Sequence, residues 1–221
     1  MRRILGGVFQ SLDGVIQAPG GPNENPTGGF AHGGWLPQFF DEEVGREIDQ
    51  LFARDYDLLL GRRTYDIFAA YWPHVGGEAA AMGEAFTRAG KYVLTRGNAP
   101  LSWANSHRLA SIDDLATLKA GSGPDLLIQG SSTLYPQLLA AGLLDQLVLM
   151  TFPLVLGAGK RLFGDGTPGK VFRLIEHRIT PKGAVIATYA PAGELTYGWA
   201  GPPVDSESEQ QRQRRMAEGT W

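Results

Sequence analysis

Residues 58–65 (LLLGRRTY) combine two signals, because a short apolar run ends abruptly in a glycine, two arginines and a threonine. Two other stretches have the same form, residues 92–96 (YVLTR) and residues 126–135 (LLIQGSSTLY). In an open α/β sheet, ligands bind beyond the carboxyl ends of the strands, where helix N-termini offer unpaired backbone N–H groups to anions. Three such strand ends predict an α/β fold with a site that could hold one dinucleotide.

Around these stretches, the hydrophobic pattern predicts further strands and helices. Apolar runs bounded by turn residues predict strands at residues 4–10, 57–60, 91–95, 125–129 and 146–155. Apolar steps of three and four predict helices at residues 39–54, 64–70, 78–89, 112–119 and 132–141, with Ser111 available to cap the fourth. Residues 172–180 and 183–189 flank Pro181 and Lys182, which predicts an antiparallel hairpin added to the sheet.

The helix predicted at residues 39–54 has two distinct faces. Its apolar face carries Phe40, Val44, Ile48, Leu51 and Phe52. Its opposite face carries Glu42, Glu43, Arg46, Glu47 and Asp49. We expect the first face to lie in the core and the second to lie in solvent.

The chain divides by composition into one domain, residues 1–195, and a C-terminal tail, residues 196–221. Within the domain, residues 18–34 are rich in glycine and proline, and a loop of this length is usually either functional, as a lid is, or disordered. The polar composition of the tail favours a mobile segment. Trp199 and Trp221 favour the alternative, a docked element, because large aromatic side chains gain much from burial.

The composition excludes several classes of function. The 221 residues include no cysteine, which excludes disulfides, thiolate metal sites and a cysteine nucleophile. The four histidines lack ligand spacing, so no metal site is expected. A net charge of -3 gives no broad reason to expect a nucleic-acid or membrane partner, and no apolar run approaches membrane-spanning length. We therefore expect a soluble, cytoplasmic protein.

The arginines that follow the strand ends have two interpretations. Arg62 and Arg63 could be a solvated pair at the start of a helix, or they could bind phosphate through their forked donors. Two cations at a helix N-terminus are repelled by the positive end of the helix dipole, and a bound anion there would offset this repulsion. The chain lacks the GxGxxG fingerprint of a Rossmann site and the lysine of a P-loop. A dinucleotide site of another kind remains, with arginines suited to a 2′-phosphate.

Five motifs in order resemble a known family. They are residues 11–14 (SLDG), 60–65 (LGRRTY), 94–96 (LTR), 130–135 (GSSTLY) and 153–163 (PLVLGAGKRLF). This series resembles the dihydrofolate reductase-like superfamily, and within it the bacterial branch related to the C-terminal reductase domain of riboflavin biosynthesis. The resemblance covers about residues 2–190, and only the five motifs together make it specific.

The resemblance implies a mostly parallel, eight-stranded mixed sheet flanked by helices, with a C-terminal antiparallel hairpin and with NADPH bound in extended form. It implies that the backbone groups of Phe9 and Ile16 bind the nicotinamide carboxamide. The remaining cofactor residues that it implies are Gly61, Arg62, Arg63, Thr64, Thr95, Arg96, Gly130, Ser131, Ser132, Thr133 and Tyr135. It also implies a homodimer, which the apolar residues 143–156 and the turn at residues 157–163 could support.

Departures from the family pattern lie at the substrate site. Trp35 precedes Asp41 at a spacing slightly longer than the folate enzymes have, and Met150 stands where they usually have a threonine. These differences favour a substrate other than folate, namely a small pterin- or aminopyrimidine-like heterocycle whose C=N or C=O group accepts a hydride. We take Trp35 and Met150 as candidate substrate contacts.

Hydride transfer leaves negative charge on the accepting group, so a proton donor should stand opposite the nicotinamide. Asp41 is the first candidate and Asp13 the second. Asp41 could instead stabilise the first turn of a helix, and Asp13 could instead bond its own backbone in a turn before Gly14. The sequence thus predicts an NADPH-dependent oxidoreductase. The alternative is a non-catalytic protein that binds or senses a nucleotide with the same fold.

Overall fold

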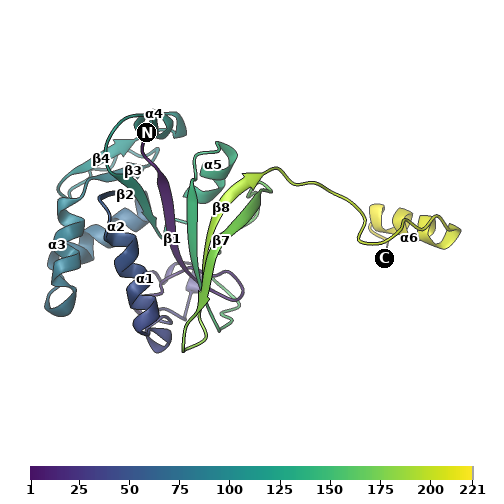
Figure 1. Ribbon diagram of the computed structural model, residues 1–221, viewed down its shortest axis with the longest axis horizontal. Helices are drawn as coiled ribbons and strands as arrows, with labels where there is room; N and C mark the ends of the chain where they lie inside the picture. Colours follow the sequence, from purple (N-terminus) through teal and green to yellow (C-terminus); the bar gives the residue numbers. More distant parts are fainter. Residues whose placement is uncertain (221) are drawn as a thin grey trace.

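The computed structural model describes residues 1–220, which form an α/β body and a projecting C-terminal helix (Figure 1). One eight-stranded sheet has the strand order β4-β3-β2-β5-β1-β6-β8-β7. The strands are β1 (Ile4–Ser11), β2 (Tyr56–Gly61), β3 (Lys91–Leu94), β4 (Ser106–Leu109), β5 (Asp125–Gln129), β6 (Gln146–Phe152), β7 (Val171–Ile179) and β8 (Val185–Gly193). The α-helices are α1 (Glu42–Phe52), α2 (Arg62–Tyr71), α3 (Ala80–Arg88), α4 (Ile112–Ala120), α5 (Leu134–Ala140) and α6 (Glu207–Ala217).

The sheet is mixed, as predicted. The first six strands pair in parallel, whereas β8 pairs antiparallel with both β6 and β7. The turn between β7 and β8 contains Pro181 and Lys182, and it closes through a hydrogen bond from the Gly183 amide to the Thr180 carbonyl (2.9 Å). The predicted hairpin is therefore confirmed, with β8 rather than β7 joined to the parallel strands.

Helices cover both faces of the sheet. On β1, Ile4 and Val8 pack in the core under α4 and α5, and Leu5 between them packs on the opposite face under α1. A third cluster lies under α2 and α3, where Tyr65 and Phe86 are buried. β6 is an interior strand between β1 and β8 and is almost entirely buried, so within residues 143–156 the exposed apolar surface lies after the strand, at Val155.

The helix predicted at residues 39–54 needs two corrections. It begins at Glu42, after the cap residue Asp41, so Phe40 precedes the helix and is exposed. Glu47, expected in solvent, is buried and pairs with Arg178 of β7. The apolar period identified the helix but could not identify an acidic residue whose partner lies on a distant strand.

Two elements had no sequence prediction. β4 has the sequence SHRL, in which Leu109 alone is buried, so it lacks the apolar run that marks the other parallel strands. α6 lies within the predicted tail, where the Ser206 hydroxyl accepts a hydrogen bond from the Glu209 amide and starts the helix (3.2 Å). None of the helices within residues 1–220 is both long and apolar enough to cross a membrane.

Candidate functional site

The core of the candidate site is the place where two neighbours of β1 separate, which is called the crevice below. β1 pairs with β6 as far as Ser11 and Phe152, whereas within residues 1–220 its pairing with β5 ends earlier, at Gly7 and Gln129. The two parallel neighbours of β1 therefore diverge at their carboxyl ends. In open α/β sheets this is the place where ligands bind.

One edge of β1 faces this crevice. The Arg3 carbonyl accepts a hydrogen bond from Leu126 of β5, and the Ile4 carbonyl accepts one from Asp145 next to β6. Because backbone groups of successive strand residues alternate in direction, those of Phe9 point to the β5 side, beyond the last paired residue. The structure thus places the Phe9 backbone at the crevice, whereas its contact with the nicotinamide carboxamide is implied by the family resemblance alone.

The ends of β2 and β5 form the opposite wall. The Gly61 amide donates a hydrogen bond to Ser131 Oγ (2.9 Å). A Cβ on Gly61 would lie 3.5 Å from Ser131 Oγ and 3.6 Å from Thr133 Oγ1, and a Cβ on Gly130 would lie 3.6 Å from Thr64. Positive φ angles of 64° at Gly130 and 55° at Ser131 turn the chain sharply after β5. This turn brings together the glycines and hydroxyl groups predicted to bind the pyrophosphate, which follow two strands about 70 residues apart. Ser132 continues the same turn.

The three candidate arginines differ in their surroundings. Arg62 Nε donates to both carboxylate oxygens of Asp66 (2.9 and 3.0 Å), and its Nη1 donates to the Ala99 carbonyl (2.8 Å). Arg63 and Arg96 are exposed, and neither takes part in an ion pair within the described chain. Arg62 is therefore held by the protein itself, whereas Arg63 and Arg96 keep their donors for a ligand.

Sequence reasoning assigned no role to Lys160, which lies in the quoted motif at residues 153–163. Its Nζ donates to Thr27 Oγ1 (2.7 Å), and its amide donates to Gln17 Oε1 (3.0 Å). Burial lowers the pKa of Lys160, and the charge of Arg63 lowers it further. Lys160 thus ties the loop at residues 18–34 to the turn after β6 and lies close enough to Arg63 for the two charges to interact.

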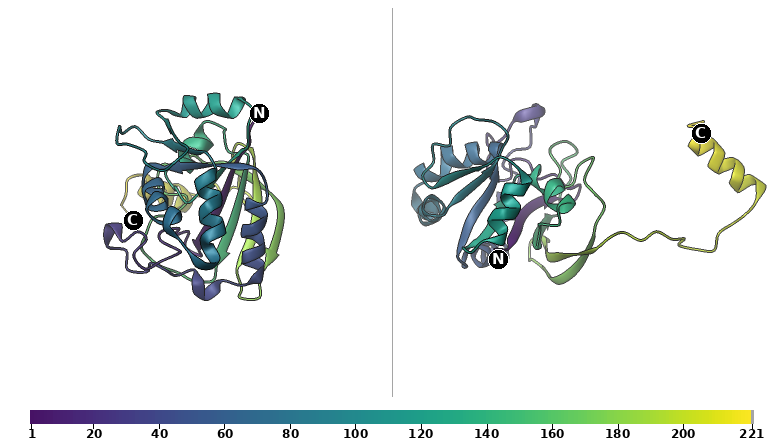
Figure 2. Two further views of the ribbon diagram at one scale, coloured as in Figure 1. Left: turned by 90° about the vertical axis from the view of Figure 1, so that its left-hand side faces the viewer. Right: turned by 90° about the horizontal axis from the view of Figure 1, so that it is seen from above.

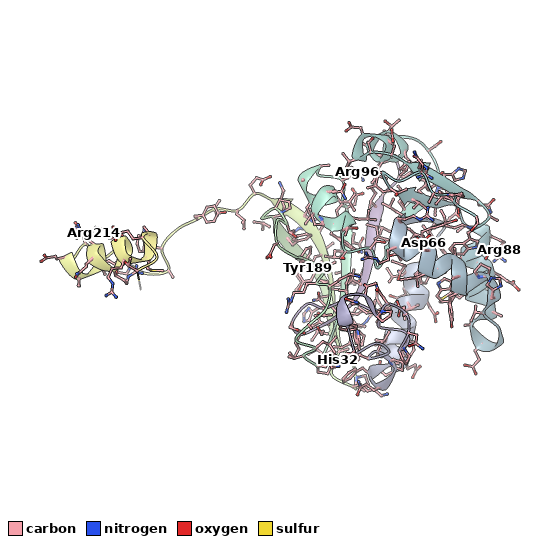
Figure 3. All side chains as sticks on the ribbon, turned by 180° about the vertical axis from the view of Figure 1, so that it is seen from behind. His32, Asp66, Arg88, Arg96, Tyr189 and Arg214 are labelled. Carbon is pink, nitrogen blue, oxygen red and sulfur yellow. The ribbon has the colours of Figure 1, made fainter. Side chains whose placement is uncertain are left out.

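The glycine- and proline-rich loop is ordered by specific contacts. Gln17 Nε2 donates to the carbonyls of Asn25 and Thr27 (2.8 and 2.9 Å), and Trp35 Nε1 donates to the Gln17 carbonyl (2.9 Å). His32 is exposed at the end of the molecule away from Arg96 (Figure 3).

This geometry agrees with the comparisons with known proteins. Residues 3–186 match the RibD C-terminal domain family. The chain belongs to that family. It is 24% identical over 210 residues to the uncharacterized protein YyaP of Bacillus subtilis, with 90% of this chain and 96% of that protein covered.

Solved structures show the same fold. A proposed riboflavin biosynthesis protein from Shewanella sp. PV-4 is 21% identical, with a TM-score of 0.58 over 86% of this chain and 99% of that one. Dihydrofolate reductase from Enterococcus faecalis, in a complex with NADP(H), is 16% identical, with a TM-score of 0.52 over 86% of this chain and 96% of that one. The predicted dihydrofolate reductase-like fold is confirmed.

Both candidate proton donors of this RibD-type domain are held by other groups. The Ser11 hydroxyl (2.6 Å) and the amides of Leu156 and Gly157 (3.1 and 2.9 Å) donate to the carboxylate of Asp13. The Ser11 hydrogen bond is the largest of the effects that lower the pKa of Asp13, against an opposing effect of burial. Asp13 therefore joins the turn after β1 to the loop after β6, and its low pKa is the reverse of what a general acid requires.

Asp41 has a similar role at the start of α1. Its carboxylate accepts hydrogen bonds from the amides of Val44 (3.0 Å) and Lys182 (3.2 Å). Burial alone would raise the pKa of Asp41, but these bonds and one from Thr180 outweigh it and lower the pKa. The structure thus makes Asp41 a helix cap that also holds the turn between β7 and β8, which argues against proton donation.

We expect Asp13→Asn to reduce the loss of stability in acid. Because the pKa of Asp13 in the folded protein is below its ordinary value of 3.8, the carboxylate stabilises the fold above that pH, and this contribution is lost as the pH falls through the folded pKa. Urea unfolding of wild type and variant near neutral pH and at about pH 3 measures the effect. If Asp13→Asn loses as much unfolding free energy in acid as the wild type does, the prediction is contradicted. Asp49→Asn, at an exposed residue, provides the control.

Several side chains predicted at the site lie instead in the core or are already bonded. Tyr135 is 0% exposed, Met150 is 1% exposed and Trp35 is 4% exposed, so none of the three offers its side chain to a ligand in this conformation. Trp35 packs against Phe152 with ring centroids 5.7 Å apart, which fills the face of β6 where Met150 lies. The Ile16 amide donates to the Lys160 carbonyl (2.8 Å), and Thr95 Oγ1 accepts from the Gly97 amide (3.2 Å).

We expect Tyr135→Phe to stabilise the protein and to leave cofactor binding unchanged. The Tyr135 hydroxyl is buried without a hydrogen-bond partner among the described residues, and such a group costs about 1–3 kcal/mol. Tyr65→Phe is the matched control, because the Tyr65 hydroxyl accepts a hydrogen bond from the Trp103 amide (2.8 Å) and its removal should destabilise. Denaturant unfolding measures both; a loss of stability in Tyr135→Phe would contradict the prediction.

Proposed function

We propose that this protein is an NADPH-dependent reductase that transfers a hydride to a C=N or C=O group of a small pterin- or aminopyrimidine-like substrate. The observation that carries the proposal is the crevice where β1 separates from β5, walled by Gly61 and Ser131 and flanked by the uncommitted cations Arg63 and Arg96. Membership of the RibD C-terminal domain family and the fold of an NADP(H)-binding neighbour support it.

The residues at the crevice fit the cofactor. The space left by the missing side chain of Gly61 lies within 3.6 Å of two hydroxyl groups, so a phosphate could lie against the Gly61 backbone and bind the hydroxyls of Ser131 and Thr133. The Gly61 amide would position Ser131 Oγ for this contact, because it already donates a hydrogen bond to that oxygen. Arg63 would neutralise the phosphates, and Arg96 would bind the 2′-phosphate beyond β3. Bound there, NADPH would supply a hydride from its nicotinamide ring.

The other proposed roles concern orientation and protonation. The Phe9 backbone would bind the nicotinamide carboxamide and so orient the ring along β1. Because hydrogen bonds lower the pKa of both Asp13 and Asp41, both carboxylates are ionised near neutral pH. We therefore propose that the proton that balances the hydride comes from water in the crevice. The protein would act on its small-molecule substrate as a homodimer in the cytoplasm.

A non-catalytic, nucleotide-binding protein is the second candidate. The burial of Trp35 and Met150 favours it, because these were the residues expected to meet a substrate. The two candidates differ in turnover rather than in binding, so a nucleotide titration tests the shared site and a screen of reducible heterocycles separates them.

We expect the wild type to bind NADPH more tightly than NADH. Arg96→Gln should weaken NADPH binding about tenfold or more and leave the affinity for NADH unchanged. The reason is that hydrogen bonds to charged groups contribute about 1.5–3 kcal/mol. Quenching of the five tryptophans measures both dissociation constants. Arg54→Gln, an exposed arginine at the opposite end of β5 from the crevice, controls for the loss of charge. Binding of neither nucleotide would refute the reductase and the sensor alike.

A further inference from the structure

The chain continues beyond the sheet as an arm, residues 194–220, that projects away from the body (Figures 1 and 2). It lies outside residues 3–186, the part that matches the family. Its first residues have an alternating pattern in which Leu195, Tyr197 and Trp199 are 42%, 90% and 69% exposed. The backbone there is extended and belongs to no strand or helix. Apolar residues at every second position of an extended chain are typical of a β-strand with one face to bury.

A sheet edge suited to such a strand is present in the same molecule. β7 is the last strand in the sheet, and within the described chain it pairs with β8 alone. Leu174, Ile175 and Ile179 on this strand are 46%, 49% and 70% exposed. Native proteins usually protect such an edge, because its free backbone N–H and C=O groups together with apolar side chains attract another strand.

The arm cannot reach the outer edge of its own β7. β8 ends at Gly193, opposite Val171 at the start of β7. Glu194 is held there by an ion pair with Lys170, and Leu195 packs over Gly169. To pair with its own β7, the chain would have to cross two strand spacings, about 10 Å, and reverse direction within the one or two residues before its alternating segment.

One exposed cation on β7 could meet an acidic residue of the arm. β7 exposes Arg173, which forms no ion pair within residues 1–220, together with the acidic Glu176. The arm carries Asp205 and Glu207 six to eight residues after Trp199, whereas Glu209 is paired with Arg212. Arg214, on the far part of the arm, lies well away from the body of its own chain (Figure 3).

We propose that two copies of this chain exchange arms, so that residues 195–199 of each copy add as a strand to the outer edge of β7 in the other. Main-chain hydrogen bonds along β7 provide affinity, and the apolar side chains at alternate positions provide specificity, as in other cases of strand addition. This exchange places a dimer contact at the hairpin, and it does not depend on the cofactor site.

Sedimentation of the full chain at micromolar concentration tests the exchange. The wild type should sediment as a dimer of the 23.9-kDa chain, and Trp199→Lys on the arm and Ile175→Lys on β7 should each give monomers. Val204→Lys and Leu12→Lys, at residues that are each 64% exposed and lie outside both surfaces, should remain dimers. A monomeric wild type, or dimers in both Trp199→Lys and Ile175→Lys, would overturn the proposal.

The lack of cysteine allows a direct test of which surfaces meet. Thr196→Cys and Glu176→Cys proteins, mixed and treated with a short bis-maleimide, should yield a cross-linked peptide that joins the arm of one copy to β7 of the other. Thr196→Cys mixed with Thr117→Cys, on the exposed surface of α4, should yield none. Absence of the first cross-link, with a dimer present, would refute the exchange. Circular dichroism of each variant checks that it is folded.

Discussion

Arg2→Met is expected to lower the free energy of unfolding by about 3–5 kcal/mol, the usual effect of removing one partner of a buried ion pair. The Arg2 side chain is 2% exposed and pairs with Asp57 of β2, which is 14% exposed. Arg2 Nε also donates to the Pro124 carbonyl (2.6 Å), and the guanidinium lies 5.1 Å from the centroid of the Tyr92 ring. The substitution leaves the Asp57 carboxylate with little solvent and with the Gly90 amide as its remaining donor (2.8 Å).

The neighbouring arginine gives a matched control. Arg3 is exposed and donates to Gln146 Oε1 (2.5 Å), so Arg3→Met removes the same charge from the same strand end at almost no cost in stability. Thermal unfolding of the two variants should differ by about 10 °C for a chain of this length. Similar midpoints for Arg2→Met and the wild type would show that the pair contributes little.

Arg2 also illustrates what the sequence could not predict. Its charge near the N-terminus is visible in the sequence, but its burial depends on Asp57 and Pro124, which are 55 and 122 residues away. Glu47 is a second case, because its place on the polar side of a helical pattern predicts exposure, whereas Arg178 pairs with it inside the fold. Long-range partners of charged groups leave no local signal in a hydrophobic pattern.

Local signals, by contrast, predicted most of the sheet and the helices. β5 was predicted at residues 125–129, the same bounds that the structure has, because a run of apolar residues is closed by Gly130. Ser111 caps α4 as predicted, and Asp114 completes a capping box. β4 was missed because a short edge strand with one buried residue has no period to detect.

The candidate site was predicted in part for a similar reason. Glycines and hydroxyls after β2 and β5 must meet, because parallel strands bring their carboxyl ends to one edge of the sheet. The pairing of Arg62 with Asp66 at i,i+4 could have been expected from helical spacing. The burial of Trp35, Tyr135 and Met150 could not, because an aromatic or sulfur-containing side chain near a strand end suits a ligand and a core equally well.

Gly61→Ala is expected to weaken NADPH binding at least tenfold, or about 1.4 kcal/mol, without a loss of stability. Gly61 has a φ of -78°, which alanine adopts without strain. Its new Cβ would meet Ser131 and Thr133 at 3.5–3.6 Å, an ordinary contact, so the fold has no reason to change. The methyl group would nevertheless occupy the space through which a phosphate must approach the hydroxyls of Ser131 and Thr133.

Gly76→Ala is the matched control, since Gly76 has an extended backbone and a Cβ there would meet nothing within 4 Å. Fluorescence titration with NADPH, together with thermal unfolding of both variants, separates binding from folding. If Gly61→Ala keeps the wild-type affinity and stability, the phosphates do not bind between the ends of β2 and β5, and the cofactor site must lie elsewhere. If it loses affinity while Gly76→Ala does not, the missing side chain at the end of β2 serves the ligand rather than the fold.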